Sequence, residues 1–219
     1  MSEDQGSPQW FADRCGCATA SRMADVLATI KNGEAASRAN YRAELIAQRL
    51  TGIVEPGYTT PDMERGTEME PFARAAYELK MNTIVEEVGF IRHPSIEWSG
   101  ASPDGLVGTD GLVEIKAPKT STHIGYLLAG IPPAKYIPQM AWQCACTGRK
   151  WCDFASYDPR LSDGLKLFVV RYTPTPEKLA EMEAAVKVFI TEIDVMLAKL
   201  NHYLSPRPLT ATEELINVP

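Results

Sequence analysis

The segment 102–116 constrains this chain more than any other part of the sequence. It begins Ser-Pro-Asp-Gly, with the aspartate at position 104, and ends in the apolar run Leu-Val-Glu-Ile-Lys, which contains Glu114 and Lys116. Strand alternation places Glu114 and Lys116 on one face and their apolar neighbours on the other. A turn at residues 109–111 would pair this strand with one starting near Leu106, and it would bring Asp104 close to Glu114.

Two carboxylates that meet at a strand edge form a hard oxygen site, which suits Mg²⁺ or Mn²⁺. A lysine beside such a site can orient and help activate a water molecule, or neutralise charge that develops on a phosphate. The pattern is short, however, and a surface hairpin with an ordinary salt bridge explains it equally well. The motif alone leaves both interpretations open.

Four further segments give the motif a context. They are Trp10-Phe11-x-x-Arg14-x-Gly16-x-x-Thr19-Ala20-Ser21, Gly66-Thr67-Glu68-Met69-Glu70, Tyr136-x-x-Gln139-x-x-x-Gln143 and Phe154-Ala155-x-Tyr157-Asp158-Pro159-Arg160. Together with the central Asp-x₉-Glu-x-Lys, which is the pattern of the PD-(D/E)xK nucleases, their order and spacing resemble the family of bacteriophage lambda exonuclease and its YqaJ-type viral recombinase relatives. The resemblance runs from about residue 10 to the end of a long C-terminal helix.

The resemblance implies an α/β fold with a PD-(D/E)xK restriction-endonuclease-like core, in which helices flank a central mixed β-sheet. It implies Mg²⁺-dependent 5′-to-3′ hydrolysis of linear double-stranded DNA with a 5′-phosphate, releasing 5′ mononucleotides and leaving a 3′ single strand for recombination by strand annealing. Two Mg²⁺ ions per site are expected, and Mn²⁺ is expected to substitute. Such relatives form a homotrimer ring and act with a single-strand annealing protein in the bacterial cytoplasm.

The resemblance also assigns catalytic roles to individual residues. Asp104 would bridge two metal ions, and Glu114 and the main-chain carbonyl of Ile115 would complete one metal site. Glu70 would approach as a third carboxylate, although Glu68 competes for that assignment if the alignment slips. Lys116 would activate the attacking water.

Other matched positions concern water and phosphate. Gln139 follows the tyrosine of its segment by three residues and would position the water or the scissile phosphate. Gln143 lies one helical turn further on, and we interpret it as part of a polar helix face. Arg14, Ser21 and Ser102 would form a pocket for the 5′-phosphate, because a planar guanidinium suits bidentate phosphate binding. Ser21 is also a candidate helix N-cap.

Two other functional classes remain open from the sequence. One is a different PD-(D/E)xK enzyme, either an endonuclease or a nuclease with an iron–sulfur cluster held by Cys15, Cys144, Cys146 and Cys152. Cys144 and Cys146 argue against a cluster, because helical geometry points them to different faces. The other class is a DNA-binding protein without activity, against which the intact acid–lysine set argues. The histidines 93, 123 and 202 form no ligand pattern.

Composition agrees with one nuclease domain over residues 1–219, with a core at about 10–203 and an extended tail from 204. The net charge of −6 is unusual for a DNA enzyme and predicts a confined contact zone rather than a broad basic face. The polar N-terminus and the lack of a long apolar run predict a cytoplasmic protein without a membrane span.

Periodicity predicts the secondary structure around the motif. Helices are expected from Thr19 or Ser21 to Ile30, at 37–50, at 61–81 with interruptions at Gly66 and Pro71, from Ser121 to Ala129, at 134–147 and at 176–203. Strands are expected in pairs at 83–92 and 98–117, and singly at 150–157 and 165–172.

Overall fold

The computed structural model describes residues 5–55, 57, 59–201 and 203. Within these residues the helices are α1 (Pro8–Arg14), α2 (Met23–Val26), α3 (Ala36–Thr51), α4 (Pro61–Met81), α5 (Thr120–Ala129), α6 (Ile137–Thr147) and α7 (Pro176–Asn201). The strands are β1 (Ala18–Thr19), β2 (Val85–Glu86), β3 (Ile91–Arg92), β4 (Ser99–Ala101), β5 (Gly105–Val107), β6 (Gly111–Lys116), β7 (Trp151–Tyr157) and β8 (Leu167–Tyr172). Short 3-10 turns precede α2 (Ala20–Arg22) and α6 (Ala134–Tyr136).

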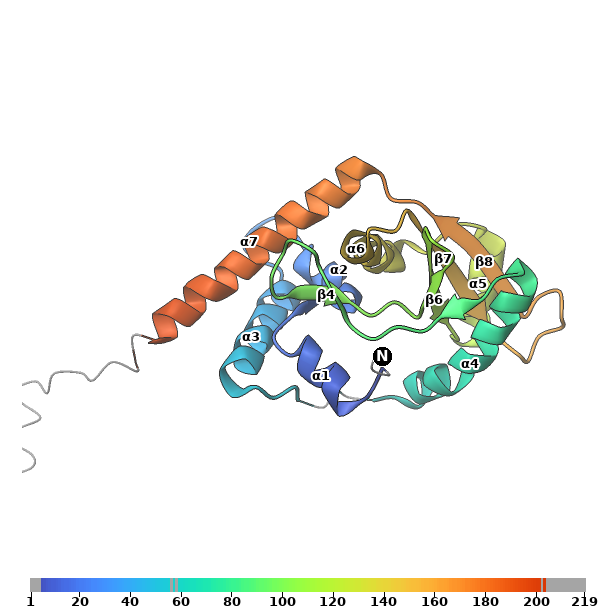
Figure 1. The fold of residues 1–219 in the computed structure, drawn as a ribbon, viewed down its shortest axis with the longest axis horizontal. Helices are drawn as coiled ribbons and strands as arrows, with labels where there is room; N and C mark the ends of the chain where they lie inside the picture. The colour runs from blue at the N-terminus through green and yellow to red at the C-terminus, as the bar shows by residue number, and fades with distance from the viewer. Residues whose placement is uncertain (1–4, 56, 58, 202, 204–219) are drawn as a thin grey trace, which may run out of the picture.

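The main sheet has five strands in the order β2-β5-β6-β7-β8, of which β6, β7 and β8 are labelled in Figure 1. β6 and β7 run parallel, and the other neighbouring pairs are antiparallel. The parallel pair requires a crossover, which α5 and α6 provide. The predicted mixed sheet between helices and the long C-terminal helix are therefore confirmed.

The two faces of this sheet pack against different helices. On one face, Ala73 and Tyr77 of α4 pack against Val113 and Ile115 of β6. On the other face, Leu112 and Phe154 pack with Met140 and Cys144 of α6. Because both faces are covered, β6 reads as a mostly apolar run in which Glu114 and the terminal Lys116 are the charged exceptions.

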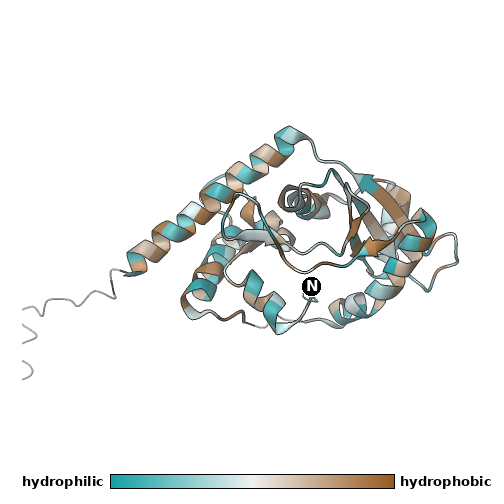
Figure 2. Cartoon of the chain, in the orientation of Figure 1, coloured by the Kyte–Doolittle hydropathy of each residue, from teal (hydrophilic) through white to brown (hydrophobic). Residues whose placement is uncertain are grey.

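A helical layer continues the core beyond α6. Met182, Val186, Phe189 and Ile193 of α7 recur at helical spacing and are buried against α2, α3 and α6. Figure 2 shows polar and apolar segments alternating along α7, as expected for a helix with one covered face.

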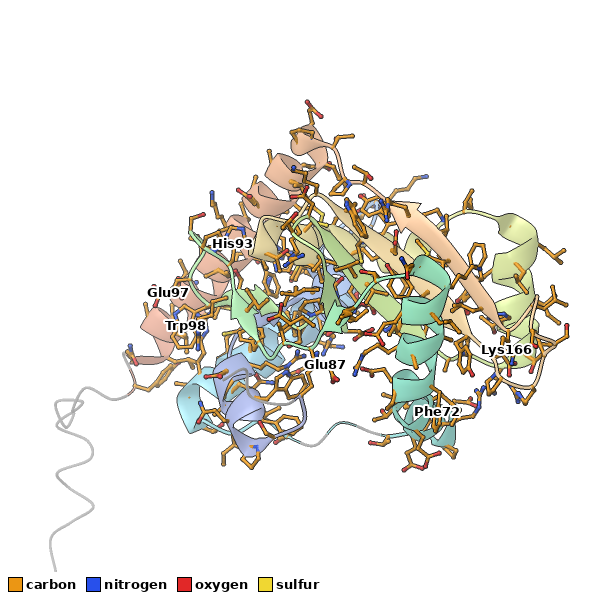
Figure 3. The ribbon with its side chains drawn as sticks, turned by 45° about the vertical axis from the view of Figure 1, so that its right-hand side comes forward. Phe72, Glu87, His93, Glu97, Trp98 and Lys166 are labelled. Atoms are coloured by element: carbon orange, nitrogen blue, oxygen red, sulfur yellow. The ribbon has the colours of Figure 1, made fainter. Side chains whose placement is uncertain are left out.

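A second, three-stranded sheet has the order β1-β4-β3 and leads into the motif. Trp98, just before β4, has a left-handed backbone with φ 58°, which is rare for a bulky residue. Contacts support this conformation: Ala18 N–H donates to the Trp98 carbonyl at 2.8 Å, and the Arg49 guanidinium lies 4.4 Å from its ring centroid. Figure 3 shows Trp98 with His93 and Glu97 beside α7, away from Phe72 on α4.

Some predicted element boundaries are wrong. The helix expected to reach Ile30 ends at Val26 and begins after a 3-10 turn in which Ser21 caps nothing. Helix α1 was not predicted, although Ser7 accepts a hydrogen bond from Trp10 N–H and Pro8 occupies its first turn. Helix α5 begins at Thr120 without a side-chain cap, so Ser121 lies inside it.

Helix α4 is continuous from residue 61 to residue 81, and the interruptions predicted at Gly66 and Pro71 do not occur. Proline costs a helix the hydrogen bond to the carbonyl four residues earlier, which here belongs to Thr67. Thr67 is exposed, so solvent can satisfy that carbonyl, and Ala73 and Tyr77 anchor the following turns in the core. Tertiary packing therefore outweighs the local breaker signals.

None of the described helices is long and apolar enough to cross a lipid bilayer. The tail predicted from residue 204 onward lies outside the described residues.

Candidate active site

Strand register brings the two motif carboxylates together. Gly105 pairs with Val113 in the antiparallel β5–β6 ladder, so one further step sets Asp104 opposite Glu114. The N–H of Ile115 donates to Asp104 Oδ2 at 2.6 Å and fixes the aspartate at the end of the hairpin. The sequence prediction of adjacent Asp104 and Glu114 is therefore confirmed in its geometry.

Glu114 is fully buried and faces α6. Gln139 Nε2 donates to Glu114 Oε1 at 2.7 Å, and Gln143 Nε2 donates to Glu114 Oε2 at 2.6 Å. The ammonium of Lys116 pairs with Oε1 as well. The interpretation of Gln143 as merely part of a polar helix face is wrong, because its side chain is fully buried and hydrogen-bonded to Glu114.

The charges of this cluster perturb one another. Burial and the negative charge of Glu114 together raise the pKa of Asp104 to about 8, against the opposing effect of Lys116. Burial disfavours the charged form of Lys116, but Glu114 and Asp104 outweigh it and raise the pKa of that lysine. Two acids beside one lysine thus make it costly for both carboxyl groups to be ionised at once.

A cavity of about 460 Å³ opens beside these residues. Asp104, Ile115 and Lys116 form one wall, and the α4 residues Gly66 and Glu70 contribute to the other. Glu68 is exposed and lies outside this lining, so the structure favours the predicted Glu70 over its competitor.

Glu70 is held in place by a neighbour on its own helix. Arg74 Nη2 donates to Glu70 Oε1 at 2.8 Å, and Arg74 also pairs with Glu87, which is labelled in Figure 3. The negative charge of Glu70 contributes to the raised pKa of Asp104, so the two carboxyl groups are close enough to interact electrostatically.

The donor set fits a hard divalent cation. Asp104, Glu114 and Glu70 offer carboxyl oxygens and Ile115 offers a carbonyl, and the positive charge of a cation would favour the ionised form of Asp104. The described side chains contain no ready-made group of three His, Cys, Asp or Glu ligands. A metal ion here would therefore need main-chain oxygen and water as well, which is the coordination that Mg²⁺ favours.

A second cluster joins helix α1 to the motif. Arg14 Nη1 and Trp10 Nε1 both donate to the Ser102 hydroxyl, at 3.1 and 2.9 Å, and the Arg14 guanidinium lies 4.1 Å from the centroid of a Trp10 ring. Burial lowers the pKa of Arg14. Among the described residues no carboxylate forms an ion pair with Arg14, so the charge of this partly buried cation is not neutralised by an acid there.

Of the three residues predicted for the phosphate pocket, two lie together in the structure and one does not. The structure brings Arg14 and Ser102 together and adds Trp10, whose conjugated ring and N–H the sequence analysis did not use. Ser21 is exposed. Its hydroxyl lies 3.4 Å from Thr19 Oγ1 and does not bond to Arg14 or Ser102.

Arg65 is another residue that the sequence analysis missed. Its Nη1 donates to the carbonyls of Ala117 and Pro118, at 3.1 and 3.0 Å, and so ties α4 to the chain just after Lys116. Its place one residue before Gly66 was the available signal, because that segment already belonged to the family pattern.

The cysteines and two of the histidines have positions or hydrogen bonds that are explained by the fold rather than by a metal or a cluster. All five cysteines are free, and Cys144 and Cys146 belong to different core clusters, as their helical spacing predicts. His123 bonds to Ser156 and to the Leu165 carbonyl, and His93 accepts from the N–H groups of residues 95 and 96. His202 lies outside the described residues.

Comparison with known proteins agrees with this arrangement. Residues 9–150 match the model of the YqaJ-like viral recombinase domain. The structure of an alkaline exonuclease, LHK-Exo from Laribacter hongkongensis, is 49% identical over 91% of this chain and 98% of its own, with a TM-score of 0.85. The structure of LHK-Exo in complex with dAMP matches equally well.

A phage related exonuclease from Haemophilus somnus 129PT shares the fold, with a TM-score of 0.65 over 84% of this chain and 96% of its own, at 12% identity. No curated protein matches. The family model spans more than half of the chain, and the identity to LHK-Exo extends over almost all of it. The chain therefore belongs to the YqaJ-like viral recombinase family.

Proposed function

We propose that this protein is a Mg²⁺-dependent exonuclease that degrades linear double-stranded DNA from the 5′ end and releases 5′ mononucleotides. The observation that carries the proposal is the connection between two clusters. Arg14 is bonded to Ser102, which stands two residues before Asp104 in the acid–lysine cluster. A group suited to a terminal phosphate thus lies next to a group suited to phosphodiester hydrolysis. The complex of the related LHK-Exo with dAMP supports a nucleoside monophosphate as product.

The acid–lysine cluster would carry the hydrolysis. Asp104, Glu114, the Ile115 carbonyl and Glu70 would hold two Mg²⁺ ions, for which Mn²⁺ should substitute. When bound, these ions supply positive charge to the attacking and leaving oxygens. Lys116, held at Glu114, would orient the attacking water or neutralise charge on the phosphate.

Gln139 and Arg14 would orient the substrate. Gln139 holds Glu114 and is only partly buried, so it can also contact the water or the scissile phosphate. Arg14 would donate to the terminal 5′-phosphate with the Ser102 hydroxyl beside it. The remaining 3′ single strand suits recombination by strand annealing, so we expect a single-strand annealing protein as partner.

The test uses linear duplex DNA with a 5′-phosphate, labelled at either the 5′ or the 3′ end, with and without Mg²⁺. The 5′ label should appear first as a mononucleotide, and chelation of the metal should stop its release. A circular plasmid should stay intact while its linear form is degraded. Early release of a 3′ label, or cutting of the circle, would instead indicate an exonuclease of opposite direction or an endonuclease.

Family membership also leads us to propose a closed homotrimer. A ring can hold DNA by enclosure, which would suit a chain with a net charge of −6. Sedimentation should show a trimer at micromolar concentration. A monomer that still degrades long DNA without dissociating would contradict this reasoning.

A further inference from the structure

We propose that Gln143 is a positioning residue of the active site, which fixes the orientation in which Glu114 meets a divalent cation. This inference rests on the metal site of the proposed function. It assigns a role to a residue one helical turn beyond Gln139, in the fully buried part of α6.

The need for such a residue follows from the flexibility of a glutamate. The last torsion of a Glu side chain is broad, so its own rotamer does not fix the plane of the carboxylate. Gln139 and Lys116 both contact Oε1 of Glu114 and leave the group free to pivot about that oxygen. Gln143 holds Oε2 at 2.6 Å, and a contact on each oxygen defines the plane.

The amide of Gln143 is itself oriented. Its NH₂ group, which only donates hydrogen bonds, faces Glu114 Oε2. The amide oxygen then faces Cys152, whose Sγ lies 3.7 Å away. Burial raises the pKa of Cys152, so its thiol stays protonated and can donate. A chain of donors thus runs from Cys152 through Gln143 to Glu114.

A count of acceptor sites shows why this matters for a cation. A carboxylate has about four lone pairs, two on each oxygen. Gln139 and Lys116 use both on Oε1, whereas Gln143 uses one on Oε2. The acceptor site left for a cation is therefore on Oε2, the oxygen that Gln143 orients. Partners of this kind, which hold a metal ligand, typically change metal affinity 10- to 100-fold when mutated.

Gln48 offers a matched control. It is also a buried glutamine on a helix, it also donates to a glutamate, Glu44, at 3.2 Å, and its amide oxygen also accepts, here from Gly16 N–H at 2.9 Å. Its partners belong to α3 and the loop after α1 rather than to the acid–lysine cluster. Loss of packing and hydrogen bonds should lower Tm in Gln48→Met and Gln143→Met alike, but only the second should affect metal binding.

The experiment measures Mn²⁺ binding by calorimetry without DNA, for the wild type, Gln143→Met, Gln143→Asn and Gln48→Met. Both Gln143 variants should bind Mn²⁺ about 10- to 100-fold more weakly than the wild type, and Gln48→Met should bind as the wild type does. Gln143→Asn keeps an amide that is one methylene too short, and it serves as the test if the methionine variant does not fold.

The outcomes separate the two proposals. If the wild type binds Mn²⁺ and a folded Gln143 variant binds it equally well, the positioning role is overturned and the metal site stands. If the wild type binds no Mn²⁺, the metal site of the proposed function fails, and the role of Gln143 fails with it. A loss of affinity in Gln48→Met as large as in Gln143→Met would reduce the effect to general destabilisation and overturn the inference.

Discussion

Arg14→Ala should remove most of the preference for a 5′-phosphorylated DNA end. In the structure, the Arg14 guanidinium lies over the Trp10 ring and donates to Ser102, and no carboxylate among the described residues pairs with it. A hydrogen bond to a charged group contributes about 1.5–3 kcal/mol. At about 1.4 kcal/mol for each tenfold change, this corresponds to roughly 10- to 100-fold in rate or affinity.

The fixed position of the guanidinium favours the upper part of that range. Little side-chain entropy remains to be lost when phosphate binds, because ring and hydroxyl already hold the group. Arg14 is also the only cation in the sequence from Trp10 to Ser21, so no neighbour in that segment can replace it. Arg14→Lys should give an intermediate result, since lysine keeps the charge but loses the planar fork.

The assay compares initial rates on two linear duplexes that differ only in a 5′-phosphate or a 5′-hydroxyl. The wild type should prefer the phosphorylated end, and Arg14→Ala should lose the preference while degrading the hydroxyl end about as fast as before. Arg22→Ala is the control, because its guanidinium also lies 4.1 Å from an aromatic centroid but pairs with Asp25 and Glu44. An equal rate ratio in the wild type and Arg14→Ala would show that the pocket lies elsewhere.

Three further predictions concern the buried charges. Asp104→Asn and Glu114→Gln should each reduce cleavage to less than a few percent of the wild-type rate with the circular dichroism spectrum unchanged, because amides keep the shape and remove the charge that binds metal. Lys116→Ala should lower the rate by about two powers of ten or more, while DNA binding measured in Ca²⁺ persists; normal cleavage would show that Lys116 has no catalytic role. Hydrogen bonds from Arg160 hold the pKa of Asp158 below its usual range, so its stabilisation is complete above the unfolded pKa of about 4 and declines as the pH falls. Asp158→Asn should therefore lower Tm more at pH 6 than at about pH 2.5, and an equal effect at both would contradict this.

The strand that carries the site could be predicted from the sequence because its signals are local. Alternation alone sets Glu114 and Lys116 on one face, and the length of the turn sets Asp104 opposite Glu114. The partners of Glu114 on α6 could not be predicted only from which face of the helix each residue occupies. Residues 140–146 of α6 are buried all round, so no solvated side exists for Gln143. The sequence contained that signal, since Gln143 is surrounded by Met, Ala, Trp and Cys.

The proposed phosphate pocket could be predicted only in part, because its residues come from segments that lie far apart in the sequence. Arg14 and Ser102 meet through contacts between positions 88 residues apart, which no periodicity reveals. The family pattern identified both residues but also included Ser21, which the structure places with Thr19 instead. Helix α1, which carries Arg14, is too short for a periodic signal, and its serine cap and proline were the usable evidence.

The short link from Ser102 to Asp104 has a consequence for the size of the product. Two residues span at most about 7 Å of backbone, and a cyclic proline between them stiffens the link. If the proposed function is correct, the group that binds the terminal phosphate, at Ser102, and the group that supports hydrolysis, at Asp104, are thus held at a nearly constant distance. This fixed distance would then set the product length at one nucleotide, independently of the identity of the base. Lengthening the link, rather than altering the chemistry, is the change that should make it cut at the wrong bond.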